Sequence, residues 1–146
     1  MNIFTIGYTH KSAKEFFNLL LVNNIEIIVD IRLNNTSQLA GYTKKKDLEF
    51  FASSIGNISY LHYQQFAPTK ELLTRYKKKQ IAWDEYEKEF ALIMQQRDCL
   101  RDFLSNVQGY TNICLLCSEE KADFCHRRLV ADYVKDSRSD VQVKHL

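Results

Sequence analysis

Four consecutive apolar residues stand at the centre of the segment Thr111-Asn-Ile-Cys-Leu-Leu-Cys117. A short, uninterrupted apolar run of this kind is typical of a strand that is covered on both faces of a sheet. Residues 124–135 follow with apolar side chains at helical spacing, which predicts an amphipathic helix. We therefore expect an interior strand followed by a helix, the repeating unit of a parallel α/β sheet.

Strand and helix patterns alternate along the rest of the chain. Strands are predicted over residues 2–6, 26–31, 58–62 and 141–146, and helices over residues 11–23, 44–54, 70–79 and 83–105. The first helix should begin at Ser12, because Ser12 and Glu15 match the capping-box pattern. The alternation predicts one domain over residues 1–146 with an α/β fold: a three-layer, doubly wound, Rossmann-like, mainly parallel sheet of about five strands, with helices on both faces.

The composition is that of a compact globular chain with nearly balanced charge. Of 146 residues, 45% are hydrophobic and 26% are charged, and 20 basic residues oppose 18 acidic ones. Bulk electrostatics therefore give no reason to expect strong binding to nucleic acid or to a membrane. Two basic clusters, at residues 44–46 and 75–79, fall where a solvated helix face is expected, so a nucleic-acid contact there is a weaker alternative.

The cysteines are expected to be free thiols. No apolar run approaches the ~18 residues of a membrane span, and no secretory signal pattern is found. We expect a cytoplasmic protein, in which Cys99, Cys114, Cys117 and Cys125 stay reduced. Cys114 and Cys117 should point to opposite faces of their strand, which excludes a dithiol or zinc pair, and Cys99 and Cys114 should pack in the core.

Ligands of such sheets bind outside the carboxyl ends of the strands, where the strand order reverses. This rule selects three loops, over residues 7–12, 32–43 and 118–126. In the first loop, Gly7, Tyr8 and Thr9 precede a helix N-terminus and form a reasonable anion-binding turn.

The second loop begins with an arginine. The planar fork of Arg32 suits a carboxylate or a phosphate, and Asn34 and Gln38 add neutral donors and acceptors. Asp30 should face the same side of the strand, so Arg32 could pair with Asp30 instead of with a ligand.

The third loop carries the most reactive side chains. Cys117 lies where the strand ends, Glu119 follows it, and Cys125, His126 and Arg127 fall in the first turn of the last helix. A helix N-terminus favours anions and lowers the pKa of a nearby thiol. Three chemistries fit these residues: a transition-metal site, a nucleophilic thiol with a histidine partner, and an anion pocket.

Local spacing separates these alternatives only in part. Asp123 is the expected N-cap of the last helix. No metal is expected, because Cys125 and His126 are adjacent and ill suited to share one tetrahedron. In a purely structural alternative, Cys125 packs under the helix, Glu119 caps it or pairs with a lysine, and His126 and Arg127 are solvated.

Several known site patterns are missing from the sequence. The three-glycine dinucleotide pattern and the phosphate-loop pattern GK[ST] are absent, so NAD and ATP have little support and no cofactor is expected. The arginine-closed thiol loop of rhodaneses and tyrosine phosphatases is not matched either, because Arg127 lies too far beyond Cys117.

Taken together, the segments resemble the domain of unknown function 488 family of small bacterial and archaeal proteins. The resemblance spans almost the whole chain and rests on Thr5-Ile-Gly-Tyr-Thr9, Val29-Asp-Ile-Arg32, Ala67-Pro-Thr69, and Leu116-Cys-Ser-Glu119 followed by Cys125-His-Arg127. It implies a doubly wound α/β fold and a prokaryotic protein, and no established reaction. The site that it implies is shared by Gly7, Tyr8, Thr9, Arg32, Cys117, Glu119, Cys125, His126 and Arg127.

The sequence leads us to expect an enzyme that acts on an anionic small molecule, of which a nucleotide is one example. Cys117 or Cys125 would be the nucleophile, His126 the proton-transfer partner, and Glu119 its orienter or a second acid or base. Such an enzyme would be a thiol-dependent or acid/base-dependent transferase or hydrolase. The alternative is a non-catalytic module that binds a ligand or nucleic acid through the same pocket. The oligomeric state is not set by any pattern in the sequence.

Overall fold

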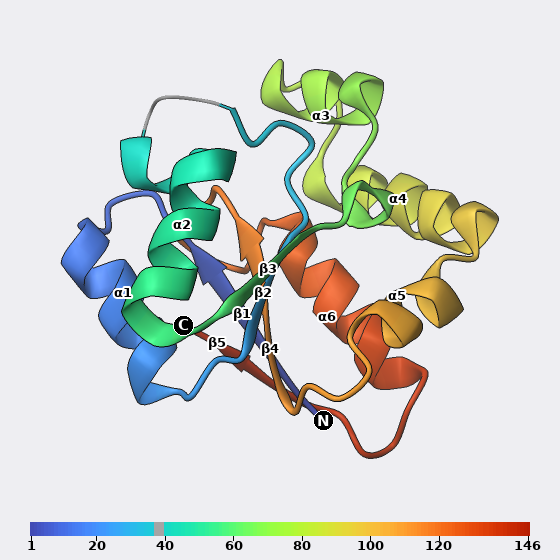
Figure 1. Ribbon diagram of the computed structural model, residues 1–146. Coiled ribbons are helices and arrows are strands. Elements are labelled where there is room, and N and C mark those ends of the chain that lie inside the picture. Colours follow the sequence, from blue (N-terminus) through green and yellow to red (C-terminus); the bar gives the residue numbers. More distant parts are fainter. Residues whose placement is uncertain (37–39) are drawn as a thin grey trace.

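The strand order places the apolar fourth strand at the centre of the sheet. The computed structural model describes residues 1–36 and 40–146. Over these residues, five parallel strands follow the order β3-β2-β4-β1-β5 (Figure 1). Their bounds are Asn2–Gly7 for β1, Ile27–Asp30 for β2, Ser59–His62 for β3, Asn112–Cys117 for β4 and Gln142–His145 for β5. The predicted parallel, doubly wound α/β fold is confirmed.

The β4 strand is hydrogen-bonded on both of its edges. Ile113 lies beside Ile3 of β1 and Ile27 of β2, and all three side chains are buried. The uninterrupted apolar run thus belongs to an interior strand, as predicted. The β2 strand is also interior, between β3 and β4, and all four of its residues are buried.

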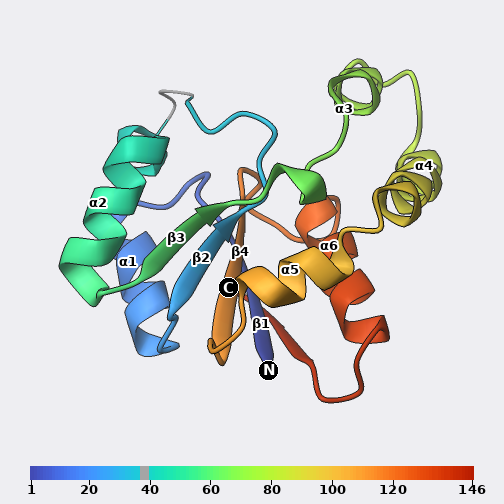
Figure 2. The ribbon, with the colours of Figure 1, turned by 45° about the vertical axis from the view of Figure 1, so that its right-hand side comes forward.

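Helices cover both faces of the sheet, which gives three layers (Figures 1 and 2). One face carries α1 (Ala13–Val22) and α2 (Lys45–Gly56), and the other carries α4 (Trp83–Arg97), α5 (Leu100–Asn106) and α6 (His126–Asp136). A further helix, α3 (Lys70–Lys77), packs against α4. Two short 3-10 helices lie at Gly41–Thr43 and Gln64–Phe66.

Alternate residues of β4 belong to two different cores. Ile113 and Leu115 pack with the face covered by α4 to α6, whereas Cys114 and Leu116 pack with the face covered by α1 and α2. Cys114 is fully buried, so its predicted core position is confirmed. Cys117 contacts the first residue of α6 and therefore points away from Cys114, which confirms that the two thiols do not form a pair.

The predicted helix over residues 83–105 is wrong in its middle. It is two helices, because α4 ends at Arg97 and Asp98 takes a left-handed conformation with φ of 43°. Aspartate is one of the few residues that adopt this conformation without a large steric cost. Apolar spacing continues across the break, since Met94 and Phe103 are both buried, and for this reason the pattern predicted one helix.

The last helix also begins later than Asp123 suggested. Its N-cap is Cys125, whose extended backbone (φ −133°, ψ 137°) precedes His126, and no side chain accepts a hydrogen bond at that cap. The Cys125 N–H instead donates to the Ala122 carbonyl in a turn. His126 and Arg127 therefore open the helix as expected, while Cys125 lies just outside it.

The start of α1 agrees with the sequence in detail. Ser12 is the N-cap, its hydroxyl accepts from the Glu15 N–H at 3.2 Å, and the Glu15 carboxylate accepts from the Ser12 N–H at 2.8 Å.

Over the described residues, no helix is long and apolar enough to cross a membrane.

Replacing Ser12 by alanine should lower the free energy of unfolding by about 1 kcal/mol, because one capping acceptor of α1 is lost. Urea denaturation of the two proteins measures the difference. Ser54→Ala is the matched control, since Ser54 is an exposed residue inside α2. Equal effects of the two substitutions would show that the capping box does not stabilise the helix.

Candidate functional site

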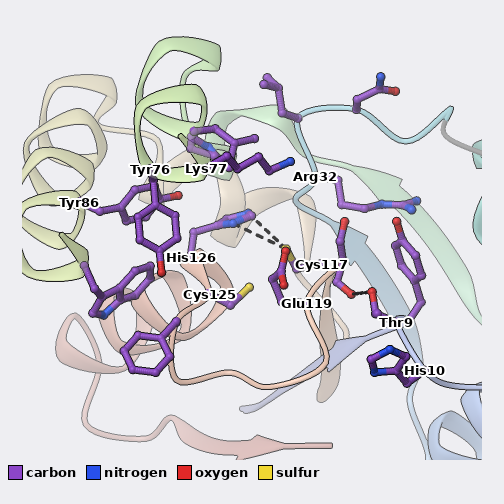
Figure 3. A pocket seen from close by; sticks show the side chains of 18 of the residues that line it. Thr9, His10, Arg32, Tyr76, Lys77, Tyr86, Cys117, Glu119, Cys125 and His126 are labelled. Atoms are coloured by element: carbon purple, nitrogen blue, oxygen red, sulfur yellow. Dashed lines mark hydrogen bonds between the residues drawn. The ribbon is translucent and has the colours of Figure 1, made fainter. Parts of the chain in front are cut away.

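The carboxyl ends of β1, β2 and β4 meet at one cavity. Because β4 lies between β1 and β2, the three loops that follow these strands are neighbours. They line a cavity of about 1110 Å³ together with residues of α3 and α4. Figure 3 shows Tyr76 and Tyr86 on one side of this cavity, Arg32 and Thr9 on the other, and Cys117 and His126 between them.

A cysteine and a histidine are in contact at the inner end of the cavity. The Cys117 sulfur lies 3.6 Å from Nδ1 and 3.9 Å from Nε2 of His126, and both residues are buried. The Nε2 atom lies 3.0 Å from the Ile31 carbonyl oxygen. Because a carbonyl only accepts hydrogen bonds, Nε2 carries a proton and Nδ1 is the nitrogen that serves Cys117.

The surroundings favour a thiolate on Cys117. A hydrogen bond from the Cys125 thiol holds the pKa of Cys117 well below its usual range, and the charge and hydrogen bond of His126 act in the same direction, against burial. Burial would lower the pKa of His126, but the Cys117 charge and hydrogen bond outweigh burial and raise it. The two groups therefore stabilise each other as a thiolate and an imidazolium.

Cys125 has the opposite character. Its pKa is raised, first by the hydrogen bond to Cys117 and then by burial. Its thiol therefore keeps its proton while Cys117 is ionised.

The same three side chains could serve as ligands of a transition metal. The sulfur atoms of Cys117 and Cys125 and a ring nitrogen of His126 all lie within 4.8 Å of one another. Thiolate and imidazole are donors that zinc and related metals prefer. The turn at the helix N-cap brings donor atoms of the adjacent Cys125 and His126 close to Cys117, which the argument that they are ill suited to share one tetrahedron did not foresee.

The buried side chain of Arg127 holds the third loop in place by hydrogen bonds. Its side chain is 1% exposed, and its guanidinium donates to the carbonyl oxygens of Glu119 and Glu120. Gly7 makes this possible, because a Cβ at that position would lie 1.6 Å from the Glu119 oxygen and 2.5 Å from Nη1 of Arg127. The purely structural alternative with a solvated His126 and Arg127 is wrong, since both are buried.

The first loop is tied to the third loop. The Thr9 hydroxyl donates to the Ser118 carbonyl at 2.6 Å, and the Thr9 N–H donates to the same oxygen at 3.1 Å (Figure 3). The Tyr8 ring lies 5.3 Å from the guanidinium of Arg32. Tyr8 and Thr9 thus line the cavity, whereas Gly7 lies behind it as a spacer for the loop.

Arg32 is paired with Asp30, which the two-residue spacing had offered as one alternative. Nε and Nη2 of Arg32 donate to the Asp30 carboxylate at 2.8 and 2.7 Å, and Nη2 also donates to the Thr43 carbonyl at 2.7 Å. Burial would lower the pKa of Arg32, but hydrogen bonds and the charge of Asp30 raise it. Tyr60 donates to the same carboxylate at 2.7 Å.

One nitrogen of Arg32 is only weakly used by this network. Among residues 1–36 and 40–146, Nη1 makes one long contact of 3.4 Å, to the Thr43 hydroxyl. Arg32 also lines the cavity, so Nη1 is the atom that can reach a ligand.

The remaining predicted site residues differ in how they are placed. Glu119 and Asn34 line the cavity, and the Asn34 oxygen accepts from the N–H and hydroxyl of Thr36. Gln38 lies outside the described residues.

An aromatic wall was not predicted as part of the site. Trp83 stacks on Tyr86 with ring centres 4.9 Å apart, and Tyr76 and Phe124 lie 5.4 and 5.7 Å from Trp83. All four rings line the cavity. The sequence held one indication of this wall. The connection between β3 and β4, residues 63–111, is longer than a single crossover helix requires.

Replacing Asp30 by asparagine should lower the free energy of unfolding by about 3 kcal/mol or more, because the buried Arg32 charge loses its partner. Thermal or urea denaturation measures the loss. Asp140→Asn breaks an exposed ion pair with Arg138 and should change stability little. If Asp30→Asn were as mild as this control, the buried pair would not organise the second loop.

Comparison with known sequences and structures gives one match. No curated protein and no solved structure is found to match this chain. A family model described as "Domain of unknown function DUF488" matches residues 12–134 of the 146 residues. This matched region includes Arg32, Cys117, Glu119, Cys125, His126 and Arg127. The chain belongs to the DUF488 family.

Proposed function

We propose that this protein is an enzyme that attacks an anionic small molecule with the thiolate of Cys117. The observation that carries the proposal is the 3.6 Å contact between the Cys117 sulfur and Nδ1 of His126 at the inner end of a large cavity. A nucleophile beside a base that is itself oriented by a third group is the arrangement of covalent catalysis. Here the third group is the Ile31 carbonyl, which holds Nε2 of His126.

The charges around the cavity favour an anionic ligand. Lys11, Lys77 and Lys79 line it beside Arg32, whose charge is balanced by Asp30, and Glu119 is the one carboxylate among the lining residues that the structure describes. In a partly enclosed cavity such an excess of positive charge attracts anions more strongly than on an open surface.

The opposite wall favours an aromatic ring on the same ligand. Trp83, Tyr76 and Phe124 pack together as an aromatic wall of the cavity with Tyr86 behind them, and Figure 3 shows Tyr76 and Tyr86 on the side away from Arg32. A planar group between this wall and the cations would place its anionic part near Nη1 of Arg32. A nucleotide is the simplest ligand with both features.

The catalytic roles follow from the protonation states. The Cys117 thiolate attacks the electrophilic atom of the substrate, and His126 donates its Nδ1 proton to the leaving group. His126, then neutral, can accept a proton from water or a second substrate. Glu119 lines the same cavity and is the second acid or base of this proposal.

Alkylation of Cys117 by iodoacetamide should remain fast well below pH ~8.5, the pKa of a free thiol, because its thiolate is already formed. The rate should fall only when the pH drops through the lowered pKa. In His126→Gln, the lost imidazolium raises the pKa of Cys117, so the fall in the alkylation rate should begin at a higher pH. Mass spectrometry of peptides at several pH values gives both profiles.

Cys114→Ala removes a buried thiol on the opposite face of the sheet and should leave the Cys117 profile unchanged. A Cys117 profile with the pKa of a free thiol would reject the nucleophile. Stoichiometric zinc in the isolated protein, with alkylation only after a chelator is added, would also reject it and would assign the three side chains to a metal.

Ligand binding should change the fluorescence of Trp83, which is the single tryptophan of the chain and lines the cavity. Adenosine monophosphate should bind more tightly than adenosine or inorganic phosphate alone, because only it has both a ring and an anion. Lys77→Gln should weaken its binding several-fold, whereas Lys88→Gln on the exposed side of α4 should not.

Equal titrations for Lys77→Gln and Lys88→Gln would contradict the assignment of the cavity as an anion site. Binding that is intact in Cys117→Ala, together with an unreactive Cys117 in the parent protein, would identify a non-catalytic binding module instead.

A further inference from the structure

Cys125 is a second thiol at the cavity to which the nucleophile mechanism gives no chemical role. It lines the cavity, is 2% exposed, and holds its sulfur within 4.8 Å of the Cys117 sulfur. The other two cysteines lie elsewhere: Cys114 packs on the opposite face of the sheet, and the Cys99 thiol donates to the Gln65 carbonyl. Only Cys117 and Cys125 therefore share one cavity.

We propose that Cys125 resolves a mixed disulfide formed on Cys117, so that the substrate reacts through an electrophilic sulfur such as that of a disulfide. The inference rests on the proposed function, since Cys117 remains the nucleophile. It adds the substrate's reactive group and a second catalytic thiol.

The geometry suits such a pair. Cys117 ends β4 and Cys125 is the extended residue before α6, so each lies at the boundary of a regular element. A disulfide needs a sulfur separation of ~2.05 Å, so the two sulfurs must move together by a few ångströms at most. Neither thiol is placed in the middle of a helix, where such a movement would break the hydrogen-bond ladder.

The reaction balances without a cofactor. The Cys117 thiolate attacks one sulfur of the substrate R–S–S–R′, the substrate's S–S bond breaks, and R′S takes the electron pair and the Nδ1 proton of His126 and leaves as R′SH. The Cys125 thiol then loses its proton to the neutral ring of His126 and attacks the Cys117 sulfur, which releases RS⁻ and forms the Cys117–Cys125 disulfide. The substrate is reduced, the two cysteines are oxidised, and an external dithiol returns them to thiols.

The two protonation states fit the two roles. The attacking thiol must be ionised at the start, and the resolving thiol must still carry its proton. The lowered pKa of Cys117 and the raised pKa of Cys125 agree with these two roles. Consumption of the Cys117 thiolate removes the charge that keeps Cys125 protonated. The first step thereby prepares the second.

Dithiobis(nitrobenzoate) tests the inference, because it is a disulfide with an aromatic ring and a carboxylate on each half. With the full-length, reduced, native protein, both halves of one reagent molecule should be released as coloured thiolate, and the product should carry a Cys117–Cys125 disulfide and no adduct. In Cys125→Ser, which keeps a hydroxyl donor to Cys117, one half should be released at a similar rate and the other should stay on Cys117. Cys114→Ala should behave as the parent protein.

Peptide mapping by mass spectrometry distinguishes the possible results. A stable adduct on Cys117 of the parent protein, with no internal disulfide, would overturn the resolving role of Cys125 and leave the proposed nucleophile standing. A native protein in which Cys117 reacts no faster than Cys114 would overturn both.

Discussion

The insertion of β4 between β1 and β2 is the constraint on which the rest of the structure depends. It aligns Cys117 with Gly7 and Leu116 with Asp30, so that three loops begin within one or two strand spacings of each other. Hydrogen bonds to backbone carbonyls tie these closely spaced loops in place, as from Thr9 to Ser118 and from Arg127 to Glu119. Gly7 shows how tight the arrangement is, because even a methyl group there would overlap the Glu119 carbonyl.

Two buried arginines hold this edge of the sheet in place. Arg32 ties the second loop to Asp30 and Thr43, and Arg127 ties the third loop through the carbonyls of Glu119 and Glu120. Burying a guanidinium costs several kcal/mol unless its donors are satisfied, so such residues are poor choices for stability alone. Their positive charge has a second effect, since Arg127 contributes to the lowered pKa of Lys11 after burial itself. The charge of Arg127 is thus felt at the cavity that Lys11 lines.

The sequence predicted the structural features that depend on residues close together in the chain. The alternation of strands and helices in a parallel sheet, the capping box at Ser12 and the possible Asp30–Arg32 pair follow from patterns over a few residues, and all are found in the structure. The break at Asp98 was not predicted, because apolar periodicity records which residues are buried and not whether the backbone between them is continuous. The aromatic wall was missed for a similar reason. Trp83 and Tyr86 match a core-facing stripe, and only the packing of α3 against α4 turns their faces toward a cavity.

The third loop shows where spacing arguments fail most clearly. Cys117 and His126 are nine residues apart, and their contact depends on the turn at the N-cap of α6, which no local motif marks. The same turn brings the sulfur of Cys125 close to Cys117. The hydrogen bond between Nε2 of His126 and the Ile31 carbonyl fixes the ring so that Nδ1 faces Cys117. As long as that ring is fixed, Cys117 has a histidine nitrogen and a thiol close to its sulfur, and its ionised form is stabilised by groups of this chain.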